Sequence, residues 1–314
     1  MSKSRRLFYA LLILSVAHWV TVQASTVRPQ PLHIEGAVPY VYKTIGGTEL
    51  RLHVVNPPHG SALVRQPAIV FFSSGGWTAG SVEQFVPQAK HFAERGMVAI
   101  LADYRVFGRH NTSPFEAMAD AKSAIRWVRS RAGDLGIDPD RIAASGGSSG
   151  GHLALSTAVF ASFDEPLENH KISSKPNALI LFNPAINTAT HPAFASRGIE
   201  GSPFHHVGRG LPPMVIFQGR ADTKALYADA ERFCLNAGGF GNRCELHGYE
   251  GAHHGFFKPH IEGGKWYRET LLEADRFLTE LGYLSKPVPS GIADSSVPDR
   301  THGHKRGAAA KHHA

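Results

Sequence analysis

The chain has 314 residues, 42% of them hydrophobic and 19% charged, which suits one large soluble domain with appendages. Its formal charge of +7 lies mostly at the two ends, which carry about +3 each, so the middle of the chain is left near +1. We therefore expect no basic face for nucleic acid.

The first 24 residues are typical of a secretory signal. Lys3, Arg5 and Arg6 precede the apolar run 7–17, and the residues up to Ala24 are small enough for cleavage there. An uncleaved membrane anchor is the alternative, although the run is short for a span and is interrupted by His18. We expect cleavage after residue 24, a secreted or periplasmic protein, and no stable membrane insertion.

Between residues 25 and 284, strand-like and helical segments alternate. Strands are predicted at 38–45, 49–56, 68–72, 97–102, from 142 into the glycine-rich turn, 178–182, 213–217 and 243–249. Helices are predicted at 84–95, from 114 to the glycines at 133 and 136, after the glycine-rich turn at 146–151, and at 223–237 and 264–282. This alternation predicts an α/β fold with a mostly parallel sheet and helices on both faces. The stretch 183–211, rich in Pro and Gly, is expected to lie over the mouth of a site, and 285–314 to be a disordered tail.

The segment Gly146-Gly147-Ser148-Ser149-Gly150 has the pattern G-x-S-x-G between a predicted strand and a predicted helix. In that context the pattern predicts a nucleophile elbow, where a strained turn exposes a serine hydroxyl. A flexible Gly/Ser turn is the plain alternative. A frame with Ser149 as nucleophile also fits, but only the Ser148 frame extends to G-x-S-x-G-G, so we select Ser148.

A serine nucleophile needs a base, and the base needs an orienting acid. Asp222 follows a predicted strand, and His254 follows the last one, which gives the order Ser, Asp, His of α/β-hydrolases. His253 competes with His254 as the base. The backbone N–H groups of Gly75, Gly76 and Ser149 are the candidate oxyanion hole.

Two further sets of residues carry predictions, one at this site and one elsewhere in the chain. Trp77 is either a wall of the acyl pocket or simple packing, and Phe256 is expected to help hold a compact aromatic acyl group. The two cysteines, Cys234 and Cys244, form a disulfide if the protein is exported, or are two buried thiols. No metal or cofactor is expected.

Taken together, these motifs resemble the hormone-sensitive-lipase-like and bacterial feruloyl/acetyl-esterase branch (BD-FAE-like) of the α/β-hydrolases. The resemblance is carried by the stretches 72–77, 103–105, 146–154, 219–222 and 249–257. It implies an α/β-hydrolase fold with a minimal cap and ester hydrolysis by Ser148, His254 and Asp222. The expected substrate is a small ester or an acylated carbohydrate. One departure is that Ser73 and Ser74 replace the histidine and first glycine of the family's H-G-G-G-W loop.

Two other functions compete with this interpretation. A serine peptidase of the prolyl-oligopeptidase type shares the elbow and the order of the triad, but no propeller domain precedes this catalytic region. A non-catalytic binding protein on a hydrolase scaffold is disfavoured because all three triad residues are present.

Overall fold

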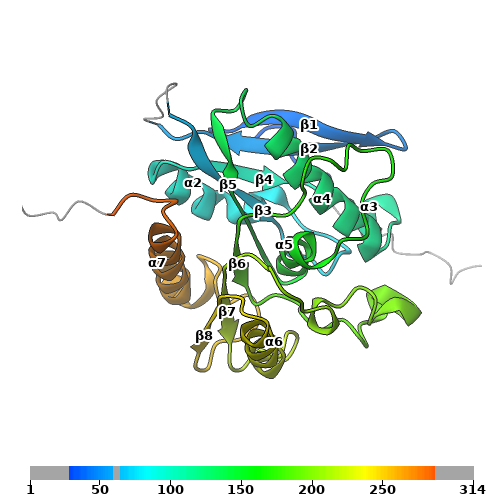
Figure 1. Cartoon of the computed structure of the whole chain (residues 1–314), viewed down its shortest axis with the longest axis vertical. Coiled ribbons are helices and arrows are strands. Elements are labelled where there is room, and N and C mark those ends of the chain that lie inside the picture. Colours follow the sequence, from blue (N-terminus) through cyan, green and yellow to red (C-terminus); the bar gives the residue numbers. More distant parts are fainter. Residues whose placement is uncertain (1–27, 59–63, 287–314) are drawn as a thin grey trace, which may run out of the picture. The chain divides into compact units, whose positions relative to one another are not determined.

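A single eight-stranded sheet forms the centre of the computed structural model, which describes residues 28–58 and 64–286 (Figure 1). The predicted signal segment and nearly all of the predicted tail lie outside these residues. The strand order is β1-β2-β4-β3-β5-β6-β7-β8, with β1, β2 and β4 paired antiparallel and every later neighbour parallel. The predicted α/β-hydrolase fold is confirmed.

The strands are β1 Val38–Ile45, β2 Thr48–Val55, β3 Gln66–Phe72, β4 Val98–Ala102, β5 Ile137–Gly147, β6 Ala178–Phe182, β7 Met214–Gly219 and β8 Cys244–Tyr249. The central ones are buried over nearly their whole length, as their continuous apolar runs predict. Because these strands run parallel, their carboxyl ends meet at one edge of the sheet, where ligand sites of such folds lie.

Helices cover both faces of the sheet (Figure 1). Helices α2 (Val86–Glu94) and α7 (Lys265–Glu280) contribute to one apolar cluster, with Phe92 and Phe277 inside it. Helices α4 (Pro114–Ser130), α5 (Ser149–Val159) and α6 (Tyr227–Gly239) contribute to the other, with Met118, Leu153 and Phe233 buried. These two clusters form the core and fix the sheet between them.

Several boundaries differ from the predictions for local reasons. The helix predicted from residue 223 begins only at Tyr227, because the backbone N–H groups of Lys224 and Ala225 turn back to the carboxylate of Asp222. The helix predicted over 84–95 is divided into a 3₁₀ turn, η1 (Val82–Phe85), and α2. A short helix, α3 (Phe107–His110), was not predicted.

The cover over the site is thin. Between β6 and β7 the chain forms only two 3₁₀ turns, η2 (Pro192–Arg197) and η3 (Pro203–His205), and a third, η4 (Ile261–Gly264), precedes α7. None of the helices in the described ranges is long and apolar enough to cross a bilayer.

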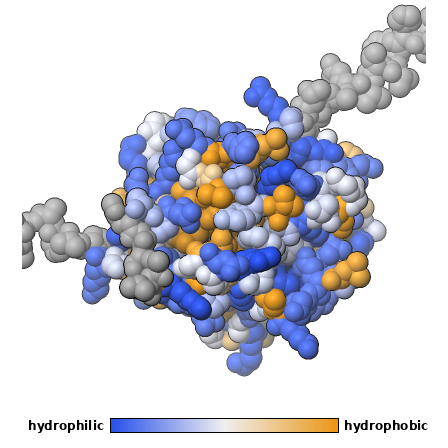
Figure 2. Space-filling view, turned by 90° about the horizontal axis from the view of Figure 1, so that it is seen from above, coloured by the Kyte–Doolittle hydropathy of each residue, from blue (hydrophilic) through white to orange (hydrophobic). Residues whose placement is uncertain are grey.

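One outer face is a mixture of polar and apolar side chains, seen from above in Figure 2. The edge strand β1 lies toward that side in Figure 1, and its Val38, Tyr40 and Val41 side chains are exposed.

On α6, Cys234 is joined by a disulfide to Cys244 at the start of β8, with 5.3 Å between their Cα atoms.

Candidate active site

The turn after β5 holds Ser148 in a strained conformation. Its φ of 52° and ψ of −118° lie outside the regions that a non-glycine residue ordinarily adopts, at a cost of roughly 1–3 kcal/mol. The Ser148 N–H donates to the Phe182 carbonyl at 3.0 Å, and the Ser148 carbonyl accepts from the N–H of Ala185 at 3.1 Å. These bonds to the neighbouring strand end hold the hydroxyl above the sheet.

The glycines of the elbow are required by close packing. A Cβ on Gly146 would lie 2.4 Å from the backbone of Gly150, and one on Gly150 would lie 2.1 Å from the carbonyl oxygen of Phe72. No side chain fits at either position without moving backbone atoms. The G-x-S-x-G pattern is therefore a packing requirement of this turn.

Three side chains from three strand ends form one chain of hydrogen bonds. The Nε2 atom of His254 lies 2.9 Å from Ser148 Oγ, and its Nδ1 atom lies 2.8 Å from Asp222 Oδ2. Asp222 accepts, so Nδ1 carries the proton and Nε2 is free to accept from the serine hydroxyl. This arrangement can remove a proton from Ser148 while Asp222 stabilises the positive imidazole.

Asp222 is kept ionised by its surroundings. Burial alone would raise its pKa, but hydrogen bonds from His254 and from the N–H groups of Ala225 and Lys224 outweigh it and lower the pKa below the usual value. Gln218 also donates to Asp222 Oδ2, at 3.1 Å. A buried, fully bonded carboxylate of this kind is suited to orienting a histidine.

The structure separates the competing candidates. His253 is exposed, and its ring contacts the carbonyl of Ala221 at 3.1 Å rather than the serine. The hydroxyl of Ser149 is buried and accepts a hydrogen bond from the Gly76 N–H at 2.9 Å. The geometry thus favours His254 and Ser148 over their neighbours in the sequence.

That bond from Gly76 corrects one expectation about the oxyanion donors. Because the Gly76 N–H is held by the Ser149 hydroxyl, it is not a free donor in this structure. Within the described residues, the N–H groups of Gly75 and Ser149 make no hydrogen bond. Gly76 instead ties the loop 73–77 to the first turn of α5.

The same loop is anchored without the family's histidine. The Ser74 N–H donates to Gln84 Oε1 at 2.6 Å, and Gln84 Nε2 donates to Ser74 Oγ at 3.0 Å. The hydroxyl of Tyr104 donates to the Ser73 carbonyl at 2.7 Å. Sequence reasoning missed Gln84, whose only signal was its place at the start of a predicted helix.

A cavity of about 610 Å³ opens above Ser148, and Trp77 lines it. The Trp77 ring is 2% exposed and packs edge-on against His152, His191 and Phe194. Phe194 belongs to the stretch 183–211, so that stretch supports the pocket wall. Trp77 is therefore both packed and part of the wall.

The expectation for Phe256 is wrong. Its side chain is 1% exposed and packs on Tyr249 and Phe257 in the apolar cluster beneath α7. It does not line the cavity above Ser148. The prediction rested on its apolar side chain and on its position two residues after His254. The turn at Gly255 instead directs this side chain into the core.

Asn183 was also missed as a site residue. It follows β6 at the same sheet edge, is fully buried, and its Oδ1 accepts from the Gly255 N–H at 3.3 Å. It thereby braces the loop that carries His254. A polar residue directly after a buried strand was the signal available in the sequence.

Comparisons with known proteins show similarity to esterases. Residues 52–183 match the BD-FAE family model. The structure is similar to esterase 2 of Thermogutta terrifontis phosphorylated by paraoxon, with 46% identity, a TM-score of 0.79, and coverage of 81% of this chain and 97% of that one. The propionate-bound form of that esterase matches with 44% identity, a TM-score of 0.77, and coverage of 80% and 97%.

Among curated proteins, the chain is 28% identical over 190 residues to a probable carboxylic ester hydrolase, LipM, of Mycobacterium tuberculosis. That match covers 53% of this chain and 44% of the relative, so the chain spans less than half the length of this curated protein. Fold and relatives together define an esterase of the α/β-hydrolase class. Within that class, residues 52–183 resemble the BD-FAE family, and the chain as a whole is similar to the Thermogutta terrifontis esterase.

Proposed function

We propose that the protein hydrolyses short-chain carboxylic esters through an acyl-enzyme at Ser148. The observation that carries the proposal is the continuous hydrogen-bonded chain from Ser148 Oγ through His254 to Asp222. Esterase neighbours that are covalently modified by organophosphates support a serine nucleophile.

The geometry supports the following reaction. Ser148 Oγ attacks the ester carbonyl carbon as its proton passes to His254 Nε2, and Asp222 stabilises the resulting imidazolium. The oxyanion is bound by the free N–H groups of Gly75 and Ser149 at the N-terminus of α5. His254 then gives the proton to the departing alcohol, which leaves the acyl group on Ser148. A water molecule, activated by His254 in the same way, attacks this acyl-enzyme and releases the acid.

The shape of the pocket supports short acyl groups. Trp77 closes one wall, and Phe194 and His152 pack behind it, so a long acyl chain would have to displace this packed cluster. The forms of the Thermogutta terrifontis esterase named as propionate-bound and butyrate-bound agree with such a preference. An acetyl group on a carbohydrate is one short-chain ester that we propose as a substrate.

A series of p-nitrophenyl esters tests the proposal. We expect kcat/KM to be highest from acetate to butyrate and to fall steeply beyond about six acyl carbons, since Trp77 excludes a longer chain from its productive position. A pocket that buried the chain would instead gain roughly 0.8 kcal/mol for each added methylene. Trp77→Ala should move the optimum to longer chains. A profile that rises toward laurate in the unaltered protein would contradict the proposed pocket.

We further propose that the protein is exported, on the basis of the signal-like residues 1–24. The disulfide between Cys234 and Cys244 supports this, because such bonds persist in oxidising compartments. N-terminal sequencing of the protein from its native host tests it, and the expected first residue is Ser25. An intact N-terminus in the mature protein would refute cleavage.

A further inference from the structure

Two lysines line the mouth of the active site. Lys224 and Lys258 border the cavity above Ser148 and also a smaller adjoining cavity that His254 shares with them. No aspartate or glutamate lines either cavity. The mouth is thus cationic.

Both lysines are fixed to the loops that carry the triad. The N–H of Lys224 donates to Asp222 Oδ1 at 2.8 Å, so its backbone position is set by the acid of the triad. The N–H of Lys258 donates to the Gly255 carbonyl at 3.2 Å. The Lys258 side chain lies over Gly255, where an added Cβ would be 3.7 Å from Nζ.

Their charges are uncompensated within the described part of the chain. Neither Nζ makes an ion pair or hydrogen bond there, whereas the buried Lys43 and Lys122 are paired with Asp120 and Asp164. Asp222 is already bonded to His254. The nearby Glu83 accepts from the Ser81 hydroxyl and does not line the cavity.

The chemistry of the triad assigns these lysines to one half of the substrate. His254 must protonate the departing alcohol oxygen, so the alcohol half leaves from the side of His254. Lys258 lies beside His254 through Gly255, and Lys224 borders both cavities that His254 lines. Trp77, by contrast, forms the apolar wall suited to the acyl half.

We propose that the preferred esters carry a carboxylate on the alcohol half, near the acylated hydroxyl, as in an acylated sugar acid. This inference rests on the proposed ester hydrolysis at Ser148 and adds the charge of the substrate to it. An anionic alcohol gains from two unpaired ammonium groups, and the same field speeds its approach at low ionic strength.

A pair of probes isolates the effect. Kinetics with 4-acetoxybenzoate and with its neutral methyl ester, methyl 4-acetoxybenzoate, give a ratio of kcat/KM values for the anionic over the neutral probe. We expect Lys224→Gln/Lys258→Gln to lower this ratio at least about tenfold in low salt, and high salt to lower it in the unaltered protein. Because each protein acts on both probes, leaving-group differences and general losses of activity cancel.

A matched control removes the same net charge elsewhere. Lys90 on α2 and Lys171 at the opposite end of the sheet are both exposed and lie outside the active-site cavities. Lys90→Gln/Lys171→Gln should leave the ratio unchanged. An equal fall in the control, or an unchanged ratio in the rim variant, overturns the inference. Failure of the unaltered protein to hydrolyse either probe would instead refute ester hydrolysis itself, and the inference with it.

Discussion

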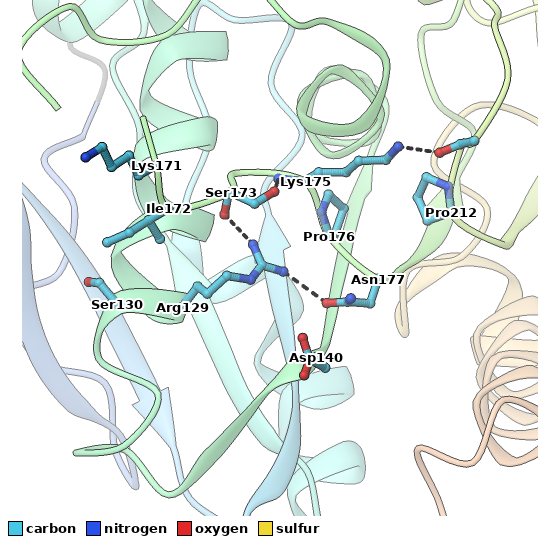
Figure 3. Close-up of a pocket in the computed structure, with 11 residues that line it drawn as sticks. Arg129, Ser130, Asp140, Lys171, Ile172, Ser173, Lys175, Pro176, Asn177 and Pro212 are labelled. Carbon is cyan, nitrogen blue, oxygen red and sulfur yellow. Dashed lines mark hydrogen bonds between the residues drawn. The ribbon is translucent and has the colours of Figure 1, made fainter. Parts of the chain in front are cut away.

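Two cavities lie at opposite ends of the parallel strands, and the smaller one holds the proposed catalytic residues Ser148 and His254. The cavity of about 750 Å³ at the amino ends is lined by Arg129, Lys175 and Asn177 (Figure 3). Arg129 donates to the Ser173 carbonyl and, at 3.0 Å, to Asn177 Oδ1, and Lys175 donates to the Gly210 carbonyl. Arg129 and Lys175 thus hold loops together, whereas the third cationic residue of this cavity, Lys171, is exposed.

The cavity at the carboxyl ends has the opposite character. Ser148 is strained, the Gly75 N–H is free among the described residues, and the lysines Lys224 and Lys258 have no anionic partner there. The comparison shows that hydrogen-bond donors without a partner and a strained backbone mark the proposed site, whereas the volume of the cavity does not. It also explains why the chemistry lies where the carboxyl ends of the strands converge.

The largest expected effect is the loss of the acid of the triad. Asp222→Asn removes the charge that stabilises the imidazolium and should lower kcat by on the order of 10³-fold or more. Steady-state kinetics on p-nitrophenyl acetate measure it. His253→Ala, which alters the neighbouring histidine outside the hydrogen-bonded chain, is the control and should cost far less. The reverse ranking would show that the wrong histidine has been assigned as the base.

The next effect concerns the support behind the pocket wall. His152 is fully buried, donates from Nε2 to the Gly201 carbonyl at 2.8 Å, and its burial lowers its pKa to about 4. The unfolded chain binds a proton at this histidine near pH 6.5, whereas the folded chain binds it only near pH 4. Stability is therefore lost as pH falls through this window, by on the order of 3 kcal/mol from this group.

The variant His152→Gln separates this loss from the titration of carboxylates. Urea unfolding between pH 7 and pH 4 should show the unaltered protein losing stability relative to the variant as the pH falls. Parallel curves for the two proteins would contradict the assignment of the loss to His152.

A smaller effect is expected from the anchor of the oxyanion loop. Gln84→Met removes both hydrogen bonds to Ser74 and should lower kcat about tenfold, less than loss of a direct oxyanion donor. Gln84→Glu keeps the acceptor for the Ser74 N–H and should recover part of the rate. Equal rates in all three proteins would show that the loop is held without Gln84.

The comparison predicts the smallest effect on activity at the larger cavity. Arg129→Met breaks bonds to the loop residues Ser173 and Asn177 and to Pro139 of β5, and should lower the free energy of unfolding by about 1 kcal/mol. Its kcat/KM should not change, because no group of that cavity contacts the triad. A matching loss of activity without loss of stability would make the larger cavity functional.

Most of the fold and the order of the triad could be predicted from the sequence, since buried parallel strands read as continuous apolar runs and the elbow has a short motif. What could not be predicted depends on the directions of side chains. Phe256 stands two residues from His254 but points into the core, and Gly76 donates to Ser149 rather than into the cavity. Asn183 contributes through a contact with the distant loop at Gly255, and Gln84 through contacts with Ser74 in the preceding loop.

The most direct test of the central claim is the site of covalent modification by paraoxon. We expect one phosphoryl group per chain, located on Ser148 by peptide mass spectrometry. Ser149→Ala should still be labelled, although its loss of the bond to Gly76 should slow turnover, and Ser148→Ala should not be labelled. Labelling that persists in Ser148→Ala, or that maps to Ser149, would contradict the account.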